Sequence, residues 1–470
     1  MSLLTDKERE DWAGQVPDAP FHRTDAGNGE HFARLYGDRI RYDHRRGRWL
    51  VWNGNWWRDD NRGEVRRLAK EAARDRYLSG AGIADLDERR AEARFAIASE
   101  NRNRLEAMLT AARSESPIAD AGDRWDADPL LMGVANGVVD LRTGGLRPGV
   151  PGDRITLHND VAFDRDARCP RWERFLDEIL EGDASLIDYV RRAVGYSLTG
   201  DTSAQCVFTC WGAGSNGKSV FLATVRAIAG GYATNTPFAT FEQMSRSGIP
   251  NDLAALAGRR IVTASEVNEG TRLNEARLKA LTGGDPITAR FLHGEFFTFQ
   301  PVLKLWLAVN HKPVVKDDSH GFWRRVRLIP FTRRFSSDAD PGLIHQLRAE
   351  SPGILAWAVQ GAIDWQRDGL EAPDPVTAAT EIYRAESDPL GDFLDDCTVS
   401  APGVEAAAGS LYSAYRSWAA EASLREREVL TSTAFGGRLS GRYQKVKRKR
   451  GWVYLGVGLR GEQRASVPGR

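Results

Sequence analysis

The fold is decided by residues 212–219, which read Gly212-Ala213-Gly214-Ser215-Asn216-Gly217-Lys218-Ser219. They match the G-x-x-x-x-G-K-S pattern of a phosphate-binding loop. An apolar, β-prone segment precedes the loop at 205–211, and a helix-forming segment follows at 220–229. This context is what the pattern needs, because backbone N–H groups and a helix N-terminus then surround phosphate oxygens. A glycine-rich turn that matches by chance is the alternative, and both flanks argue against it.

Two side chains of this loop have distinct expected roles. Lys218 would reach the β- and γ-phosphates of ATP, and the Ser219 hydroxyl would ligate Mg²⁺. The sequence thus predicts an α/β nucleotide-binding core whose ligands are ATP and Mg²⁺. The residues expected to contact the nucleotide are Gly212, Gly214, Ser215, Asn216, Gly217, Lys218 and Ser219.

The bulk composition describes a globular chain with no global preference for nucleic acid. At 470 residues the chain is too long for one ordinary core, so several domains are expected. The net charge is only +1, so any affinity for DNA must come from local patches. The N-terminus lacks an apolar signal segment and no long apolar run follows. Both facts predict a cytoplasmic protein without a membrane span.

Residues that resemble metal ligands have no convincing partners in the sequence. Cys206 and Cys210 fall in the predicted buried strand, so we expect core thiols there rather than zinc ligands or a disulfide. Asp126 and Asp128 resemble half of an acidic metal pair, but a nucleotidyl-transfer site needs further carboxylates nearby. We therefore expect these aspartates to be loop residues.

Residues 1–145 predict an N-terminal α+β domain. Its tryptophan-rich segment 41–57 predicts a hairpin that turns at Asn53-Gly54. The aromatic residues either stack on nucleic-acid bases or fill the core of a small sheet, and we favour the core. Charged amphipathic helices are expected at 64–79 and 86–113, and a second hairpin at 130–141 with Asn136-Gly137 at its turn.

Two apolar strands downstream of the loop end on polar side chains. A helical collar or linker at 146–204 precedes the predicted ATPase domain at 205–370. Within that domain, the strand at 261–265 is followed by Glu266, which would polarise the attacking water and help hold Mg²⁺. The strand at 302–309 ends on Asn310, which would position that water. The alternative for Glu266 is a strand-end carboxylate that faces solvent.

A hairpin and an arginine pair complete this region. Residues 291–297 predict a hairpin whose tip is His293-Gly294. Arg324 and Arg325 precede a strand at 326–331, where an arginine from a neighbouring subunit would stabilise transition-state charge. Taken alone, a double arginine is more often plain surface charge.

In this order, the pieces resemble the superfamily 3 helicases of small viruses, phages and plasmids, a branch of the AAA+ ATPases. They look most like the helicase half of phage and plasmid primase-helicases. The resemblance is weaker, though present, over residues 25–199. The phrases that carry it are 212–219, 264–270, 279–290, 308–313 and 322–325.

The resemblance implies a role for each matching residue. Lys218 and Ser219 would be the Walker A pair, Glu266 the Walker B acid and Asn310 the sensor. Arg325 would be the arginine finger, with Arg324 as second choice.

It also implies an assembly and a DNA site. Such proteins act as rings, usually hexamers, because the finger and the nucleotide belong to different subunits. Arg290 and His293 would lie on a hairpin that grips single-stranded DNA in the central channel.

Two departures from the family pattern stand out. Walker B often has two adjacent acids in the wider superfamily, whereas Ser265 precedes Glu266 here. This leaves the second shell of Mg²⁺ open. Many relatives also carry a primase domain, and its acidic set is missing, so we expect a helicase without priming activity.

Residues 385–470 predict a winged helix-turn-helix, a common DNA-binding module. Helices are expected at 410–422 and 432–440, followed by a basic β-wing at 443–455. A charged hairpin used in protein contacts is the alternative. The residues expected to contact DNA phosphates are Lys445, Lys447, Arg448, Lys449 and Arg450.

The sequence as a whole predicts an ATP-dependent, ring-forming replicative DNA helicase of a phage, plasmid or other mobile element. It would translocate on single-stranded DNA and act on forks, and it leaves room for a separate primase or initiator as partner. The alternative is a replication initiator or scaffold whose ATPase controls assembly. The predicted hairpin between Glu266 and Asn310 favours the motor, because an assembly switch has no need of it.

Overall fold

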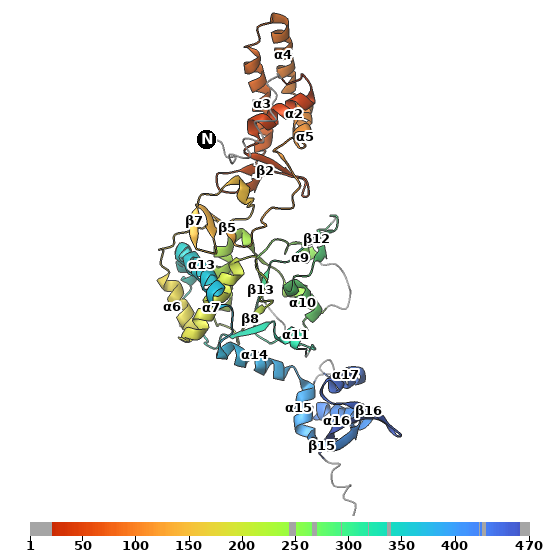
Figure 1. The fold of residues 1–470 in the computed structure, drawn as a ribbon. Coiled ribbons are helices and arrows are strands. Elements are labelled where there is room, and N and C mark those ends of the chain that lie inside the picture. The colour runs from red at the N-terminus through yellow and green to blue at the C-terminus, as the bar shows by residue number, and fades with distance from the viewer. Residues whose placement is uncertain are drawn as a thin grey trace, which may run out of the picture.

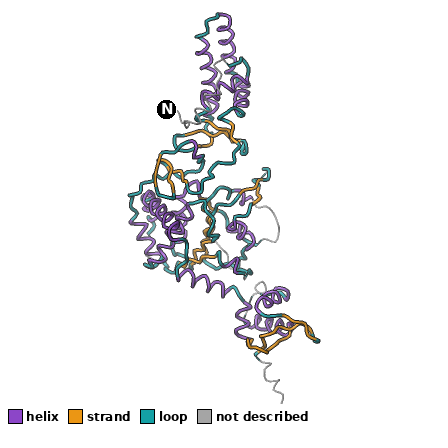
Figure 2. The backbone as a smooth tube through the Cα atoms, in the orientation of Figure 1, coloured by secondary structure: helices purple, strands orange, loops and turns teal. Residues whose placement is uncertain are grey.

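The computed structural model describes residues 21–243, 251–265, 270–292, 294–317, 319–335, 340–422, 424 and 429–460. Three parts follow one another along the molecule: helices on a small sheet, a mixed part around a larger sheet, and a small C-terminal module (Figure 1). Figure 2 shows the strands of the middle part with helices on either side of them. Within the described residues, no helix is both long and apolar enough to cross a membrane.

The N-terminal part packs helices against a sheet with the strand order β3-β2-β1-β4. The predicted helix over 86–113 is two helices, because Asn101 takes an extended conformation and starts the second one. The elements are α2 (Asp25–Tyr36), β1 (Ile40–Asp43), β2 (Arg48–Trp52), β3 (Trp57–Asp59), α3 (Glu64–Gly80), α4 (Leu86–Ser99), α5 (Arg102–Ala112) and β4 (Ala119–Asp120).

The tryptophans of this part lie in a core, which was the favoured interpretation of the tryptophan-rich segment. Trp52 and Trp57 are buried and form a cluster with Leu50 and Trp125. The segment makes two turns rather than one, because β2 pairs with both β1 and β3. Only the second turn contains the predicted Asn53-Gly54.

A three-strand unit links this part to the middle. It consists of β5 (Leu131–Val134), β6 (Gly137–Asp140) and β7 (Gly145–Arg147), followed by η1 (Pro151–Asp153). The predicted hairpin is confirmed, but Val134 pairs with Gly137, so its turn is Ala135-Asn136. The Asn136 side chain exchanges two hydrogen bonds with the Phe163 backbone, which fixes the turn one residue earlier.

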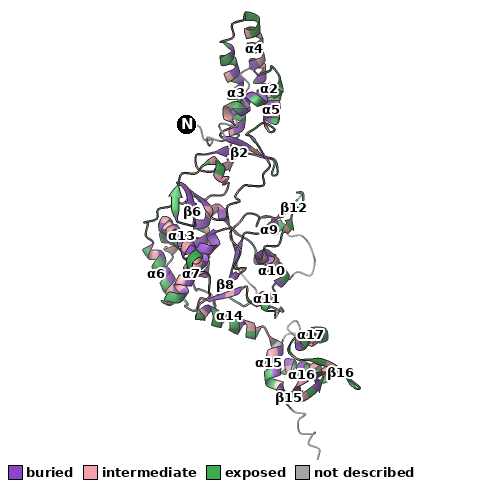
Figure 3. Ribbon diagram, in the orientation of Figure 1, coloured by how far each residue is buried: buried purple, intermediate pink, exposed green. Residues whose placement is uncertain are grey.

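The predicted α/β fold with a parallel sheet is confirmed in the middle part. The sheet has the order β14-β8-β13-β10-β9, and every neighbouring pair is parallel. The central strand β13 is buried along its whole length, as expected for a sheet covered on both faces (Figure 3). The strands are β8 (Val207–Trp211), β9 (Ala233–Asn235), β10 (Ile261–Ser265), β13 (Lys304–Val309) and β14 (Val326–Pro330).

Helices cover both faces of this sheet. On one face, the core joins the helix after the glycine loop to helices from before and after the sheet. These are α6 (Pro170–Ile179), α7 (Ala184–Leu198), α8 (Lys218–Ala229), α12 (Leu343–Ala349) and α13 (Ser351–Asp368). Those of the other face are η3 (Phe238–Phe241), α9 (Asn251–Ala254), α10 (Glu275–Gly283), α11 (His320–Trp323) and α14 (Asp374–Glu386).

The remaining elements of the middle part are short. They are η2 (Gly230–Tyr232), β11 (Ile287–Ala289) and β12 (Phe297–Phe299), and the last two form a separate antiparallel pair.

The C-terminal module has its own core and a sheet with the order β15-β17-β16. Both predicted helices and the basic hairpin are present. Strand β15 was not predicted, because Pro402 and Gly403 interrupt its pattern, and its register shifts between Ser400 and Glu405. The elements are α15 (Pro389–Cys397), β15 (Thr398–Ala407), α16 (Ala408–Glu421), α17 (Ser432–Arg442), β16 (Lys445–Arg448) and β17 (Gly451–Leu459).

Candidate nucleotide site

Three parallel strands end together at one edge of the larger sheet. Ser265 of β10 pairs with Ala308 of β13, and Val309 pairs with Trp211 of β8. The glycine loop leaves this edge after Trp211, and Asn310 leaves it after Val309. Glu266 follows Ser265 directly in the sequence, but it lies outside the described residues.

The loop holds the Lys218 ammonium on its own oxygen atoms. Lys218 Nζ donates to the Gly212 carbonyl oxygen at 2.8 Å and to Asn216 Oδ1 at 3.1 Å. The side chain is buried, and burial lowers the pKa of Lys218 from its ordinary value. Both acceptors are uncharged. A phosphate that displaced them would place a negative charge next to the ammonium.

The loop backbone leaves room for an anion. Gly214 has a φ of +104°, and a Cβ added there would meet nothing within 4 Å. Helix α8 begins at Lys218, after Gly217 at a φ of +80°, and no side chain of the described residues caps this helix. The N–H groups of its first turn therefore face the loop, and Ser219 is exposed beside them. These features fit the phosphates of a nucleotide and a hydrated Mg²⁺.

A segment after β14 brackets the loop, and the sequence did not reveal it. The Phe331 N–H donates to the Trp211 carbonyl at 2.7 Å, and the Phe335 N–H donates to the Ser215 carbonyl at 2.8 Å. Between them, the Arg333 carbonyl accepts a 2.6 Å hydrogen bond from the Asn216 side chain. No sequence pattern signals this contact, because it follows from the parallel pairing of β14 with β8, which carries both segments past the same edge.

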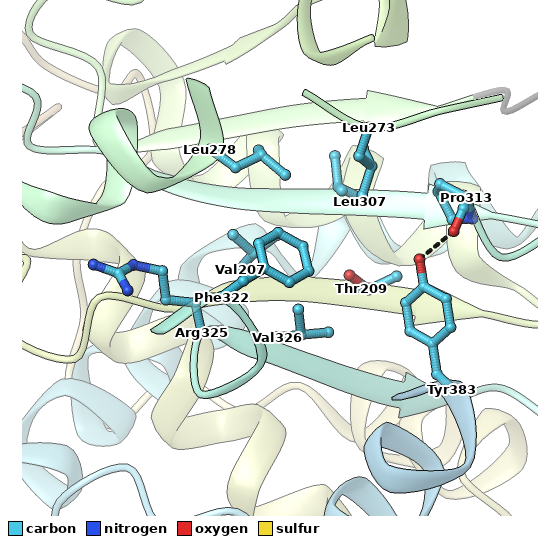
Figure 4. A pocket seen from close by; sticks show the side chains of 10 residues that line it. All are labelled: Val207, Thr209, Leu273, Leu278, Leu307, Pro313, Phe322, Arg325, Val326 and Tyr383. Carbon is cyan, nitrogen blue, oxygen red and sulfur yellow. Dashed lines mark hydrogen bonds between the residues drawn. The ribbon is translucent and has the colours of Figure 1, made fainter. Parts of the chain in front are cut away.

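The strand end at Asn310 is braced by helix α14. Asn310 is exposed, while the preceding carbonyl of Val309 accepts from the Gly212 N–H at 3.2 Å. Lys312 Nζ lies 4.4 Å from the Trp211 ring centre and 2.7 Å from Glu386 Oε2. The next residue is held as well, because the Tyr383 hydroxyl donates to the Pro313 carbonyl at 2.5 Å (Figure 4).

Arg324 and Arg325 lie at the opposite end of the sheet from the loop of their own chain. Val326 pairs with Val207, the first residue of β8, whereas the loop follows the last. The two ends are roughly 13 Å apart along the strand. Both guanidinium groups donate to Gln205 Oε1, and that of Arg325 also donates to the Gly321 carbonyl.

A cavity beside Arg325 is apolar and small. Figure 4 shows it among side chains of β8, β13, β14 and α11, with the Arg325 guanidinium directed away from it. Its free volume of about 10 Å³ is no more than one water molecule needs. It does not resemble a ligand site.

The predicted DNA-binding residues lie on two separate elements. The β11–β12 pair confirms a hairpin, and the Arg290 guanidinium lies 4.9 Å from the Phe296 ring centre in the connecting loop. His293, the predicted tip, lies outside the described residues. The other cations are exposed on the β16–β17 hairpin of the C-terminal module, namely Lys445, Lys447, Arg448, Lys449 and Arg450.

Cys206 and Cys210 belong to the hydrophobic core of the middle part, as expected for core thiols. Cys206 and Cys210 are buried, and burial raises the pKa of the Cys206 thiol to about 12. Asp126 is a loop residue, as expected, and it accepts hydrogen bonds from the N–H groups of Thr156 and Leu157. In the described part of the chain, no group of three or more His, Cys, Asp or Glu side chains could hold a metal ion.

Two family models match the chain, each over part of its length. Residues 29–181 match a model described as "D5 N terminal like". Residues 210–325, which include the glycine loop and both arginines, match a family of unknown function, DUF5906.

Curated relatives come from large DNA viruses. A "Putative helicase" of Acanthamoeba polyphaga mimivirus is 28% identical over 319 residues, covering 62% of this chain and 33% of that protein. A "Putative helicase" of Frog virus 3 is 25% identical, covering 63% and 39%. A "Putative primase" of African swine fever virus is 26% identical, covering 62% and 33%. The chain thus spans only a third or slightly more of these relatives' length.

Among solved structures, the apo C-terminal region of NrS-1 is 11% identical, with a TM-score of 0.48. It covers 92% of this chain and 99% of that one. Over the matched residues the chain is thus similar to a D5-type model and to viral proteins named as putative helicases or primases.

Proposed function

We propose that the chain is an ATP-dependent, ring-forming replicative DNA helicase of the superfamily 3 branch of AAA+ ATPases. It would serve a phage, plasmid or other mobile element inside the host cell and move along single-stranded DNA. The observation that carries this proposal is the parallel register of β8, β13 and β14. The loop and Asn310 share one edge of the sheet, and the arginine pair belongs to the other edge. In this proposal Arg325 would therefore act on the nucleotide of a neighbouring subunit.

In this proposal each group at the edge has one task. Lys218 binds the β- and γ-phosphates of ATP, and the loop N–H groups bind the remaining phosphate oxygens. Ser219 and Glu266 would hold Mg²⁺, which would neutralise developing phosphate charge. Asn310 orients the attacking water. Arg325, or Arg324 in second place, would reach the γ-phosphate from the next subunit.

DNA would be contacted at two places. The β11–β12 loop, with Arg290 and His293, would line the channel of a hexameric ring. The C-terminal module would act as a winged helix, and its basic hairpin would lie against phosphates. The fork would thus be held outside the ring while one strand passes through it.

Unwinding of a labelled forked duplex tests this proposal. The full chain with ATP and Mg²⁺ should release the labelled strand, and Lys218→Ala should release none. Arg290→Ala should keep ATP turnover and lose unwinding, because it acts on DNA rather than on phosphate. Normal unwinding by Lys218→Ala would overturn the assignment of the site.

A replication initiator or scaffold is the second candidate. It is favoured by the position of the basic hairpin, which lies in a module separate from the nucleotide edge (Figure 1). For this candidate, ATP binding would change the assembly state without strand release. A fork that stays intact while ATP assembles the chain would select it.

A further inference from the structure

The basic hairpin carries a half-exposed tryptophan, Trp452, which is not part of the module's hydrophobic core. Trp452 is 50% exposed near the start of β17, and Lys447 of β16 lies directly opposite. An exposed aromatic ring among cations is the combination with which proteins bind single-stranded nucleic acid. Figure 1 shows the hairpin at the outer side of the module.

The register fixes which face of the hairpin bears this side chain. Lys445 pairs with Tyr454 and Lys447 pairs with Trp452, so these four side chains share one face. Tyr454 is buried in the module core, and its hydroxyl donates to the Gly436 carbonyl at 2.9 Å. The strand is therefore anchored, and the indole two residues farther out is presented on a rigid element.

One lysine lies against the indole, and further cations lie next to it along the hairpin. Lys445 Nζ lies 5.2 Å from the Trp452 ring centre. Lys449 and Arg450 form the adjacent turn and are exposed. By contrast, Arg448 is paired with Glu405 at 3.0 Å. This combination of an aromatic face and flanking positive charge suits a ligand with flat rings on an anionic backbone.

We propose that Trp452 stacks on an unpaired base, so that the β16–β17 hairpin binds single-stranded DNA or a strand junction in preference to a continuous duplex. Bases inside a duplex are already stacked on each other and offer no free face to an indole. The cations would bind the phosphates of single-stranded and duplex DNA alike, so only the stacking would make the hairpin prefer the single strand. This inference rests on the proposed function in one respect, that the partner is DNA.

Fluorescence anisotropy of the full chain without ATP tests the inference. The probes are a labelled 20-nucleotide single strand and the matching 20-base-pair duplex. Trp452→Ala should weaken single-strand binding by about tenfold, the effect of one stacked base, and leave duplex binding within about twofold. Trp452→Phe should recover most of the loss.

Two matched variants control for charge and for a general loss of exposed aromatic surface. Lys447→Ala should weaken both probes alike and flatten the salt dependence, because it contacts only phosphate. Tyr77→Ala removes a similarly exposed ring from helix α3, at the far end of the molecule, and should change neither.

The outcomes separate this inference from the proposed function. Equal weakening of both probes by Trp452→Ala, or no change in either, would overturn the stacking role. ATP turnover is measured on the same samples. Loss of single-strand preference in Trp452→Ala, in a chain that hydrolyses no ATP, would support the inference and contradict the helicase. DNA-stimulated ATP turnover, together with DNA binding that Trp452→Ala leaves unchanged, would support the helicase and contradict the stacking inference.

Discussion

The side chain of Asn216 donates a 2.6 Å hydrogen bond to the carbonyl oxygen of Arg333, 117 residues away in the sequence. Its Oδ1 atom accepts from the Gly214 N–H at 2.6 Å and from Lys218 Nζ at 3.1 Å. One amide therefore joins the glycine loop, the lysine and the segment after β14. The shape of the loop depends on this amide as well as on the glycines.

Asn216→Ala should weaken ATP binding by about tenfold while the chain stays folded. The substitution removes the hydrogen bonds to Gly214 and Arg333, each of about 1 kcal/mol, from a loop that must be ordered before it binds. The third bond, to Lys218, is one that a bound phosphate would displace. Titration with a fluorescent ATP analogue measures the loss. Asn216→Asp keeps the acceptors, loses the bond to Arg333 and adds a negative charge beside the phosphates, so it should bind ATP more weakly still. Equal affinities for the Ala variant and the natural chain would contradict the role of this amide.

Arg325→Ala and Lys218→Ala should each be inactive alone and regain turnover when mixed. A mixed interface can pair an intact Lys218 loop with an intact Arg325 from the neighbour, which no single-variant ring provides. Loss of a trans-acting arginine costs about 10³-fold or more in turnover. Arg367→Ala, which removes an exposed arginine of α13, should stay active. Mixtures that remain as inactive as their components would exclude a finger in trans.

Lys312→Ala should lower the thermal midpoint more than Glu386→Ala does. The Lys312 side chain is mostly buried and lies on Trp211, whereas Glu386 is largely exposed. We expect about 1–2 kcal/mol for loss of the cation–π contact and packing, and under about 1 kcal/mol for loss of the exposed carboxylate. Differential scanning calorimetry compares the two. A larger effect from Glu386→Ala would show that the ion pair, rather than the ring contact, braces this strand end.

At pH 8 the native chain should expose one reactive thiol to a disulfide reagent. Burial raises the pKa of Cys169 and Cys206 to about 12, so their thiolate fractions are about a thousandfold below that of a free cysteine. Cys210 is shifted the same way. Burial also raises the pKa of Cys397, but this thiol is only half-buried, so the reagent can reach it. All four should react after unfolding. Rapid reaction of Cys206 in the native chain would contradict its burial directly before β8.

Local patterns in the sequence sufficed to predict the strands and helices around the loop. The runs at 205–211, 261–265 and 302–309 are apolar, bounded and short, so they predicted buried strands. The structure confirms these strands at 207–211, 261–265 and 304–309. β15 was not predicted, because Pro402 and Gly403 interrupt its sequence pattern. The strand accommodates them through a register shift. The break at Asn101 depends on backbone conformation, which composition alone does not reveal.

The candidate site was predictable only where its residues are close in the sequence. The spacing of its glycines, Lys218 and Ser219 predicted the loop, and its place at the end of an apolar run predicted Asn310. The contact of Arg333 with Asn216 joins segments that only strand order brings together, and no periodicity reports strand order. The exposure of Trp452 was equally hidden, because whether an aromatic in a hairpin is covered depends on which helix packs on its face.

ATP hydrolysis, measured with and without single-stranded DNA on a species of known solution mass, tests the central claim most directly. The account predicts turnover that rises when DNA is added, in a particle with the mass of a ring. Turnover that ignores DNA, or full turnover by a monomer, would contradict it, because a monomer cannot bring Arg325 to the edge of the sheet where its own loop lies.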